Sequence, residues 1–283
     1  MSNLTVTVLV DNHTLIGHHY TGEHGLSLFI EQGKKKCLFD IGYSDLFLSN
    51  AYKMGIDLLH LDYLALSHGH IDHTGGLIPL MRRHMEAAIE KLPHRCPTVI
   101  AHPCCFYRRP ASPLANIGAP VEKKELERHY HVKISQSPVW LTPYLVFLGE
   151  IPRDAGDVAP KIPKEWMIVT PDGMQPDPLL DDTALVFKSN TGLVIITGCS
   201  HSGIGNIIRY AQQVCSDERI RDVIGGFHLM GDDPAGIKRT VKEIKTSKPA
   251  ALHPCHCTSL AAKCALAKVA PVYEVGVGLV MEY

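Results

Sequence analysis

The sequence predicts an α/β fold, and the order of its apolar and polar segments is the reason. In the second half an apolar strand, a short polar tip and a helix follow one another three times. In the first quarter most segments have strand character, and the next apolar strand runs into a cluster of histidines. With 283 residues, 45% of them hydrophobic, the chain can build one large α/β domain or two small ones.

The elements of the first half follow from hydrophobic periodicity and from turn residues. Strands are expected at residues 5–10, 26–31, 37–39, 61–66 and 98–101, and helices at 44–54 and 77–91. The first helix has apolar residues at helical spacing from Leu46 to Met54 and ends at Gly55, a residue typical of helix C-termini. The strand over 61–66 delivers the histidines at its C-terminal end, where open α/β sheets bind their ligands.

The second half is regular again after a segment that is harder to assign. Strands are expected at 183–188, 193–196, 223–224, 250–252 and 272–275, and helices at 204–214, 234–245 and 259–268. Between the halves lie a proline-rich link, a charged helix-like run over 121–128 and short β segments at 132–134, 139–141 and 144–148. We expect an insertion or cap at about 103–165.

Composition excludes some classes of protein. The formal net charge of −1 gives no bulk basic field, so nucleic acid is not an expected partner. No apolar run reaches the roughly 18 to 20 residues that span a bilayer, so no membrane is expected. Residues 1–11 resemble a strand rather than a signal peptide, and nine cysteines without a disulfide-like spacing suit a reducing compartment. We therefore expect a cytoplasmic protein. Its oligomeric state does not follow from the sequence.

A metal site is predicted where the strand over 61–66 ends. His68, His70, Asp72 and His73 fall within six residues, and Gly75-Gly76 follows them. Neutral imidazoles and a carboxylate are the ligands that borderline divalent metals prefer. We expect one or two divalent ions, with zinc favoured and iron, manganese or nickel also suited. A solvated polar loop is the alternative.

Other polar residues follow later strands. His102, Arg108 and Arg109 come just after the strand over 98–101 and are candidates for binding an anionic small-molecule substrate, because arginine contacts phosphate in bidentate fashion. A solvated basic surface is the alternative. His228, at the tip of the strand over 223–224, is a candidate metal ligand, proton donor or substrate contact, or else a structural histidine.

The stretch His68-Gly69-His70-Ile71-Asp72-His73 resembles the H-x-H-x-D-H signature of the metallo-β-lactamase superfamily. As in that family, a strand ending in Phe39-Asp40-Ile41-Gly42 precedes it. The resemblance covers residues 24–80 well and 180–260 moderately. It implies one domain over 1–283 with a four-layer αββα sandwich and the metals at the edge between two sheets. Gly198-Cys199-Ser200-His201 and Gly225-Gly226-Phe227-His228 resemble a branch of metal-dependent hydrolases and, in archaea, ribofuranosylaminobenzene 5′-phosphate synthases.

The resemblance also implies a division of the ligands in the motif. His68 and His70 are expected on one metal, and Asp72 and His73 on the other. Asp40 is expected to accept the second ring proton of a metal-binding histidine.

The remaining ligands are expected from the tips of later strands. Cys199 stands where the family has an aspartate that bridges the two metals. It is either a metal ligand or a thiol packed in the core. His201 is the favoured compensating ligand, or else a histidine that only binds substrate. His256 is favoured over His253 as the last ligand, with Cys255 and Cys257 on the opposite side of the chain; zinc held by these two cysteines alone is a minor alternative. One of the two aspartates Asp181 and Asp182, with Asp182 favoured, is expected to bind the metal or to accept a hydrogen bond from a metal ligand. A loop turn is the alternative.

Metal-assisted hydrolysis of an ester or phosphoester is the function expected from these residues. Asp72 would orient the attacking water, and His201 or His228 would protonate the leaving group. One alternative is a synthase that joins a pterin to a ribofuranosylaminobenzene phosphate. The other is a non-hydrolytic redox or sensor module whose cysteines hold iron or another metal.

Overall fold

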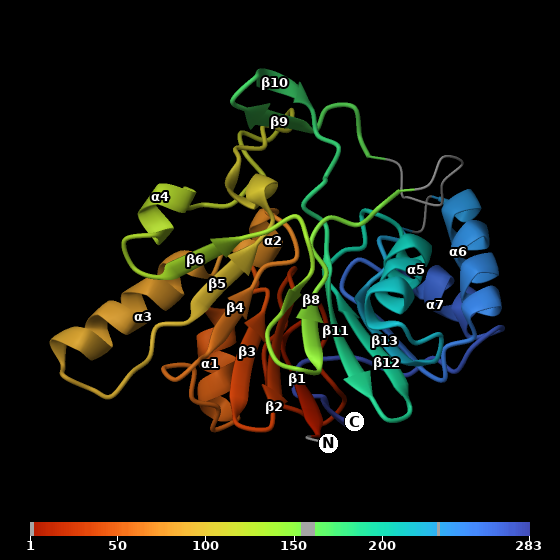
Figure 1. Cartoon of the computed structure of the whole chain (residues 1–283), viewed down its shortest axis with the longest axis horizontal. Coiled ribbons are helices and arrows are strands. Elements are labelled where there is room, and N and C mark those ends of the chain that lie inside the picture. The colour runs from red at the N-terminus through yellow and green to blue at the C-terminus, as the bar shows by residue number, and fades with distance from the viewer. Residues whose placement is uncertain (1–2, 154–161, 231–232) are drawn as a thin grey trace.

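The computed structural model describes residues 3–153, 162–230 and 233–283, and two β-sheets stand face to face at its centre (Figure 1). The first sheet has the strand order β15-β1-β2-β3-β4-β5-β6. Its strands are β1 (Leu4–Val10), β2 (Ser27–Gln32), β3 (Lys35–Phe39), β4 (Tyr63–Ala65), β5 (Thr98–Ala101), β6 (His131–Ile134) and β15 (Val280–Glu282). The strands from β3 to β6 run parallel, so their C-terminal ends share one edge of the sheet.

The second sheet has the strand order β14-β13-β12-β11-β8-β7. Its strands are β7 (Val139–Trp140), β8 (Leu145–Phe147), β11 (Ala184–Ser189), β12 (Gly192–Thr197), β13 (Ile220–Gly226) and β14 (Leu252–Cys255). The strands β12, β13 and β14 are parallel, and each leads into a helix. This is the repeated strand, polar tip and helix that the sequence predicted.

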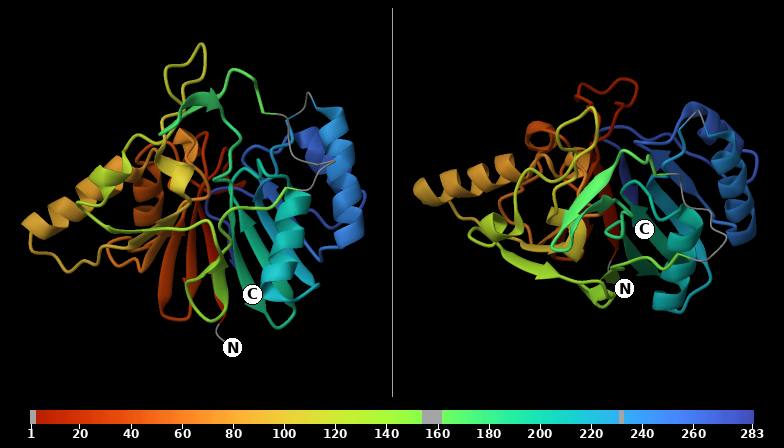
Figure 2. Two further views of the ribbon diagram at one scale, coloured as in Figure 1. Left: turned by 45° about the horizontal axis from the view of Figure 1, so that its top comes forward. Right: turned by 90° about the horizontal axis from the view of Figure 1, so that it is seen from above.

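Helices cover the outer face of each sheet, as Figure 2 shows. The first sheet carries α1 (Leu46–Lys53) and α3 (Leu77–Ile89), and the second carries α5 (Ile204–Cys215), α6 (Pro234–Ser247) and α7 (Leu260–Leu266). The short helices are α2 (Ile71–Thr74), η1 (Pro103–Phe106) and α4 (Lys123–Leu126). The predicted four-layer αββα arrangement is confirmed. No helix among the described residues is long and apolar enough to cross a membrane.

The core explains why these strands read as nearly continuous apolar runs. In β2, Leu28 and Ile30 point into the layer between the sheets, whereas Phe29 packs toward the helices. In β12, Val194 lies between the sheets and Ile195 faces the outer helices. Both faces of β2 and of β12 are therefore buried, which favours apolar residues at nearly every position of these strands.

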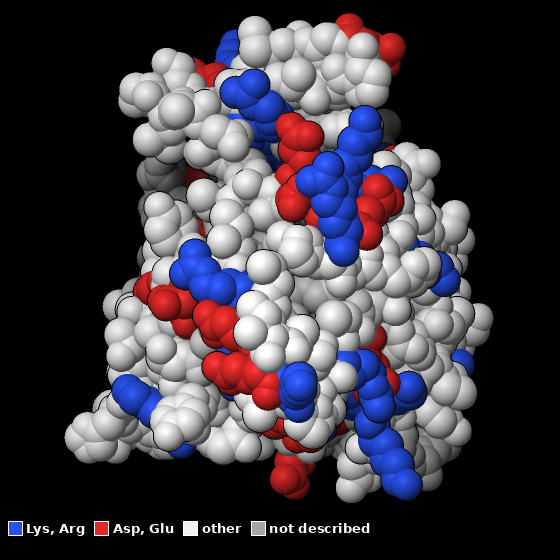
Figure 3. Space-filling model, turned by 90° about the vertical axis from the view of Figure 1, so that its left-hand side faces the viewer, with Lys and Arg blue, Asp and Glu red and all other residues white. Residues whose placement is uncertain are grey.

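Surface charge is mixed on the face that carries α3 and α4. Figure 3 shows acidic and basic side chains next to one another there. The ion pairs of α4, such as Lys123 with Glu127 at 2.9 Å, have this character. Pairs of this kind neutralise each other locally and contribute little to stability.

The strand predicted at residues 272–275 is wrong. Val272 forms only an isolated bridge to Leu252, and Pro271 before it has no N–H to extend a ladder. The C-terminal strand is β15, eight residues beyond Val272, which pairs antiparallel with β1. The terminal segment therefore adds an edge strand to the first sheet instead of to the second.

The segment 103–165 is divided by the structure rather than folded as one cap. Its strand β6 belongs to the first sheet, and β7 and β8 belong to the second. Residues 154–161 lie outside the described residues. A hairpin that the sequence did not predict, β9 (Met167–Thr170) and β10 (Gly173–Pro176), stands above the sheets (Figure 1). The N–H of Met167 donates to the carbonyl oxygen of Pro110 at 3.0 Å, which ties this hairpin to the loop over 107–122.

Candidate metal centre

Polar side chains from five strand ends meet at one edge between the two sheets. Asp40 follows β3, the motif at 68–73 follows β4, and the tips of β12, β13 and β14 contribute the rest. Four residues here have a left-handed backbone although none is glycine: Asp40, Ser200, His228 and His256, with φ of 55°, 60°, 46° and 51°. Such conformations cost about 1 to 3 kcal/mol each and gather at functional sites.

Glycine lets the motif pass through a crowded turn. A Cβ atom at Gly69 would lie 2.0 Å from the carbonyl oxygen of Cys105. One at Gly75 would lie 2.0 Å from the carbonyl oxygen of Tyr43. The turn then enters α2, with His70 as its N-cap residue, so Asp72 and His73 return toward the same edge.

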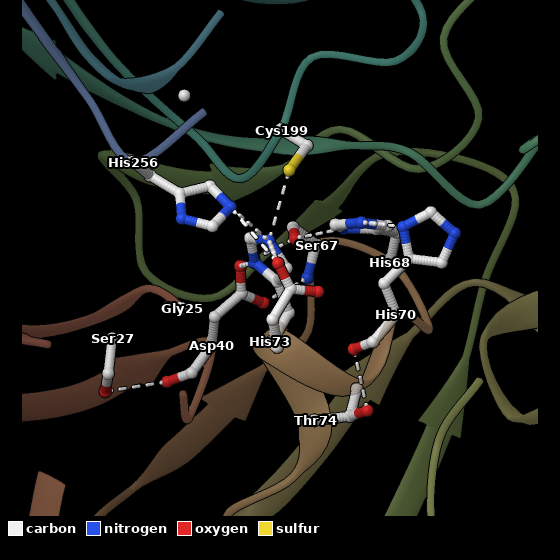
Figure 4. Close-up of polar contacts among 12 residues, drawn as sticks. Gly25, Ser27, Asp40, Ser67, His68, His70, His73, Thr74, Cys199 and His256 are labelled. Atoms are coloured by element: carbon white, nitrogen blue, oxygen red, sulfur yellow. Dashed lines mark hydrogen bonds and ion pairs between the residues drawn. The ribbon is translucent and has the colours of Figure 1, made fainter. Parts of the chain in front are cut away.

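One group of four potential ligand atoms is formed by Asp72, His73, Cys199 and His256. The Nε2 atom of His73 lies 3.2 Å from Cys199 Sγ and 3.2 Å from His256 Nε2 (Figure 4). The Oδ2 atom of Asp72 lies 3.3 Å from His256 Nε2 and 3.7 Å from His73 Nε2. Ligand atoms on one tetrahedral zinc are about 3.3 to 3.8 Å apart. His73 therefore has the spacing of a shared metal with Cys199 and His256, and Asp72 has it with His73 and His256.

A second group of potential ligand atoms is formed by His68, Cys199 and His201, and the ring of His70 lies beside it. The His201 ring centroid lies 4.9 Å from that of His68 and 5.0 Å from that of His70. Both ring nitrogens of His201 and the Nε2 atom of His70 are buried without a hydrogen-bond partner among the described residues. Buried polar atoms are rarely left unpaired, so these nitrogens point to a ligand.

Cys199 belongs to both groups, because its sulfur also lies with ligand atoms of His68 and His201. The division of the motif, with His68 and His70 on one metal and Asp72 and His73 on the other, stays a prediction. His201, which was expected to compensate for the missing bridging aspartate, lies with His68, and both groups share the sulfur of Cys199.

The electrostatics of the site suit a divalent cation. Burial, followed by the charges of neighbouring histidines, holds the pKa of His68 and of His201 well below the usual value. Burial and Arg109 lower the pKa of His70 to about 3. Burial raises the pKa of Asp72, but His73 and the hydrogen bonds to His24 and His256 hold it well below the usual value. Neutral imidazoles, a carboxylate and sulfur fit zinc and related divalent metals.

Three buried aspartates hydrogen-bond to the potential ligands or to the backbone near them and so fix their orientation. Asp40 Oδ2 lies 2.6 Å from His73 Nδ1, which is the contact predicted for it. Asp11 accepts the backbone N–H of His256 at 2.8 Å. Asp182 accepts the N–H of Ser202 at 2.8 Å and is outside the ligand groups, so the structure places it behind the site.

A cavity of about 480 Å³ opens beside the two groups. Its polar wall includes His24, Asp72 and His228, and its apolar wall is formed by Ile71, Leu114, Ile117, Trp166 and Met230. A second cavity of about 440 Å³ shares His24, Met230, His256 and Cys257 with it and also contains Lys263. The ligand groups therefore lie where two cavities meet, one lined by Trp166 and the other by Lys263.

The residues predicted to bind an anionic substrate lie elsewhere. Arg109 is fully buried, with Nε 2.8 Å from Asp177 and Nη2 2.7 Å from Asp181, so two carboxylates already neutralise it. The buried His102 accepts the N–H of Cys104 and contacts Glu150. None of His102, Arg108 and Arg109 lines either cavity at the ligand groups.

Three residues of the site were missed by sequence reasoning. His24 lies 3.2 Å from Asp72, but no motif spacing marked it in the sequence. Trp166 lines the cavity and precedes the unpredicted hairpin. Cys257 was expected on the side opposite to His256, but the left-handed backbone of His256 breaks the alternation of side chains and turns Cys257 inward.

The histidine that was not favoured, His253, lies away from the ligand groups. Its Nδ1 atom is 2.7 Å from Asp222, and its ring stacks on Tyr273. Of the two histidines, His256 is the one that lies among the potential ligand atoms.

Comparison with known proteins assigns the family. The model of the metallo-beta-lactamase superfamily matches residues 20–211. The chain therefore belongs to this superfamily, and the predicted family is confirmed.

Individual proteins of known sequence or structure resemble this chain over most of its length. A 7,8-dihydropterin-6-methyl-4-(beta-D-ribofuranosyl)-aminobenzene-5'-phosphate synthase of Methanocaldococcus jannaschii is 28% identical, over 93% of this chain and 90% of that protein. An uncharacterized protein of the same archaeon is 30% identical, over 91% of each chain. The crystal structure of a metal-dependent hydrolase of the beta-lactamase superfamily is 27% identical and aligns over 99% of both chains with a TM-score of 0.81.

Proposed function

We propose that this protein is a metal-dependent hydrolase acting on an ester or phosphoester of a small molecule. The observation that carries the proposal is the meeting of two ligand groups, joined at Cys199, with a cavity of about 480 Å³. The structural relative with a TM-score of 0.81, a metal-dependent hydrolase, supports it. Zinc is the metal that we propose, because its ligands are commonly histidine, aspartate and cysteine.

The residues of the chain divide the work around the metal. A bound divalent metal supplies acidified water and stabilises negative charge. Asp72, at the cavity wall and 3.2 Å from His24, orients the attacking water and accepts its proton. His228, which lines the same cavity, donates a proton to the leaving group.

The walls of the two cavities suggest the substrate. Trp166, Leu114 and Ile117 give one cavity a flat apolar wall suited to a ring. Lys263 lines the other cavity, and its ammonium group can bind an anion. We therefore propose a substrate with a ring and an anionic group on either side of the reacting bond. Lys263 takes the place expected for Arg108 and Arg109.

A cytoplasmic location is part of the proposal. All nine cysteines are free thiols. Thiols in this number persist in a reducing compartment.

The second candidate is a synthase that joins a pterin to a ribofuranosylaminobenzene phosphate. The relative of that name, 28% identical over 93% of this chain, favours it. Its substrates have a flat ring system and a phosphate, which also suit the two cavities.

Depletion assays separate the two candidates. Purified metal-loaded protein is incubated with a panel of esters and phosphodiesters, and separately with a pterin and an arylamine phosphate. The proposal expects turnover of the first set alone, and consumption of the second set alone would replace it with the synthase. His70→Ala should lose both metal content and phosphodiesterase-type activity, and full activity in a metal-free variant would refute the proposal.

A further inference from the structure

A second sulfur lies beside Cys199 at the metal centre. The Sγ atoms of Cys199 and Cys257 are 3.5 Å apart, and the residues are only 4% and 5% exposed. With a ring nitrogen of His228 they form a further group of potential ligand atoms within 4.8 Å of one another. Sulfurs of one tetrahedral zinc are about 3.8 Å apart, so the pair is close to the spacing of two ligands.

These two cysteines differ from the other buried cysteines. Cys37, Cys105, Cys215 and Cys255 pack within the apolar clusters of the described core. Cys199 and Cys257 belong to none of those clusters and line the cavity with the histidines instead. Hydrophobic packing therefore does not account for their burial.

The backbone of β13 makes room for the second sulfur. A Cβ atom at Gly226 would lie 2.5 Å from Cys257 Sγ, so a larger residue there would displace the sulfur. The backbone N–H of His228 donates to the same sulfur at 3.3 Å. A hydrogen bond donated to sulfur favours the thiolate form, which is the form that binds metals.

We propose that Cys257 is a metal ligand and that it acts with Cys199 as a pair of thiolates. The proposal rests on the metal binding in the proposed function and adds a ligand to that site. Two thiolates make one side of the centre soft, whereas Asp72 is a hard ligand. The site should therefore select zinc, cobalt, cadmium or ferrous iron over magnesium and manganese.

Cobalt substitution tests the sulfur pair directly. The full-length protein is stripped of metal under reducing, anaerobic conditions and loaded with Co²⁺, and the sulfur-to-cobalt charge-transfer absorption per bound cobalt is measured. We expect Cys199→Ala and Cys257→Ala each to lose about half of this absorption, because each removes one of two sulfurs. The matched control is Cys255→Ala, which removes a buried thiol of the same segment outside the site and should keep all of it.

The outcomes separate this proposal from the proposed function. Unchanged absorption in Cys257→Ala, with cobalt still bound, would overturn the sulfur pair and leave the metal site intact. Absence of bound cobalt in the wild-type protein would overturn both. If a variant fails to fold, ¹¹³Cd NMR of the wild-type protein decides: a resonance in the range of two sulfur ligands supports the pair, and one in the range of a single sulfur contradicts it.

Discussion

The Oδ2 atom of Asp40 lies 2.6 Å from the Nδ1 atom of His73, and both side chains are fully buried. Asp40 also accepts the backbone N–H of Ser67 at 2.7 Å, so its carboxylate is itself fixed. This contact assigns the Nδ1 proton and directs the Nε2 atom of His73 toward Cys199 and His256 (Figure 4). A carboxylate in this position sets the orientation and basicity of a metal-binding histidine.

Replacing Asp40 should therefore weaken metal binding without removing a ligand. For Asp40→Asn we expect zinc affinity to fall about 10- to 100-fold, measured by competition with a chromophoric chelator. The matched control is Asp222→Asn, which disturbs another buried aspartate–histidine pair, with His253, away from the site. Equal affinities of the wild-type protein and Asp40→Asn would contradict this role.

The buried Arg109 should prove to be a structural residue. Arg109→Met leaves Asp177 and Asp181 as buried carboxylates without their cation, and we expect the free energy of unfolding to fall by about 3 to 5 kcal/mol. Urea unfolding followed by circular dichroism measures this loss. Arg219→Met, which removes an exposed cation paired with Asp217, is expected to leave the free energy of unfolding nearly unchanged. Similar effects of the two variants would refute the assignment.

Trp166 should contribute to substrate binding more than to the chemical step. It lies at the apolar wall of the cavity, with its ring 5.0 Å from that of His70. For Trp166→Ala we expect KM to rise about tenfold with a smaller change in kcat, measured by steady-state kinetics. Trp140→Ala, at the partly exposed Trp140 in β7, is the control and should leave both constants unchanged. A selective loss of kcat in Trp166→Ala would contradict the expectation.

The buried His84 should make the fold sensitive to acid. Burial, followed by the charges of His94 and Arg83, lowers the pKa of His84 to about 4, and its Nδ1 atom contacts the hydroxyl of Tyr130 at 2.8 Å. As pH falls from about 6.5 to about 4, the unfolded chain binds a proton that folded His84 does not, so stability is lost in that window.

The comparison with His84→Gln isolates this contribution. Glutamine does not titrate, so the variant should lose stability less steeply, by up to about 1.4 kcal/mol per pH unit. Urea unfolding of both proteins between pH 7 and pH 4 measures the difference. Parallel pH dependences would show that His84 titrates alike in the folded and unfolded chains.

Local sequence patterns predicted the fold and placed the residues of the motif close together. Apolar periodicity located the strands and outer helices, and the motif from His68 to His73 needs only the turn after β4 to bring its residues together. His256 was preferred over His253 because it lies beyond Pro254, at the tip of the strand. Each of these predictions depends on residues near one another in the sequence or on a general property of parallel sheets.

The features that were missed depend on contacts between distant segments or on single backbone angles. The partners of Arg109 lie 68 and 72 residues away, so the sequence around it did not reveal its burial. The inward turn of Cys257 depends on the φ of 51° at His256. The hairpin of β9 and β10 is largely exposed and therefore lacks the apolar alternation that identifies a strand.

The central claim is that hydrolysis depends on a metal held by this cluster. Chelator-treated protein is given increasing amounts of zinc, and bound zinc and the rate of ester or phosphodiester hydrolysis are measured on the same samples. The proposal predicts no hydrolysis without zinc and a rate that rises in proportion to bound zinc until the site is filled. An undiminished rate in the metal-free protein would contradict it.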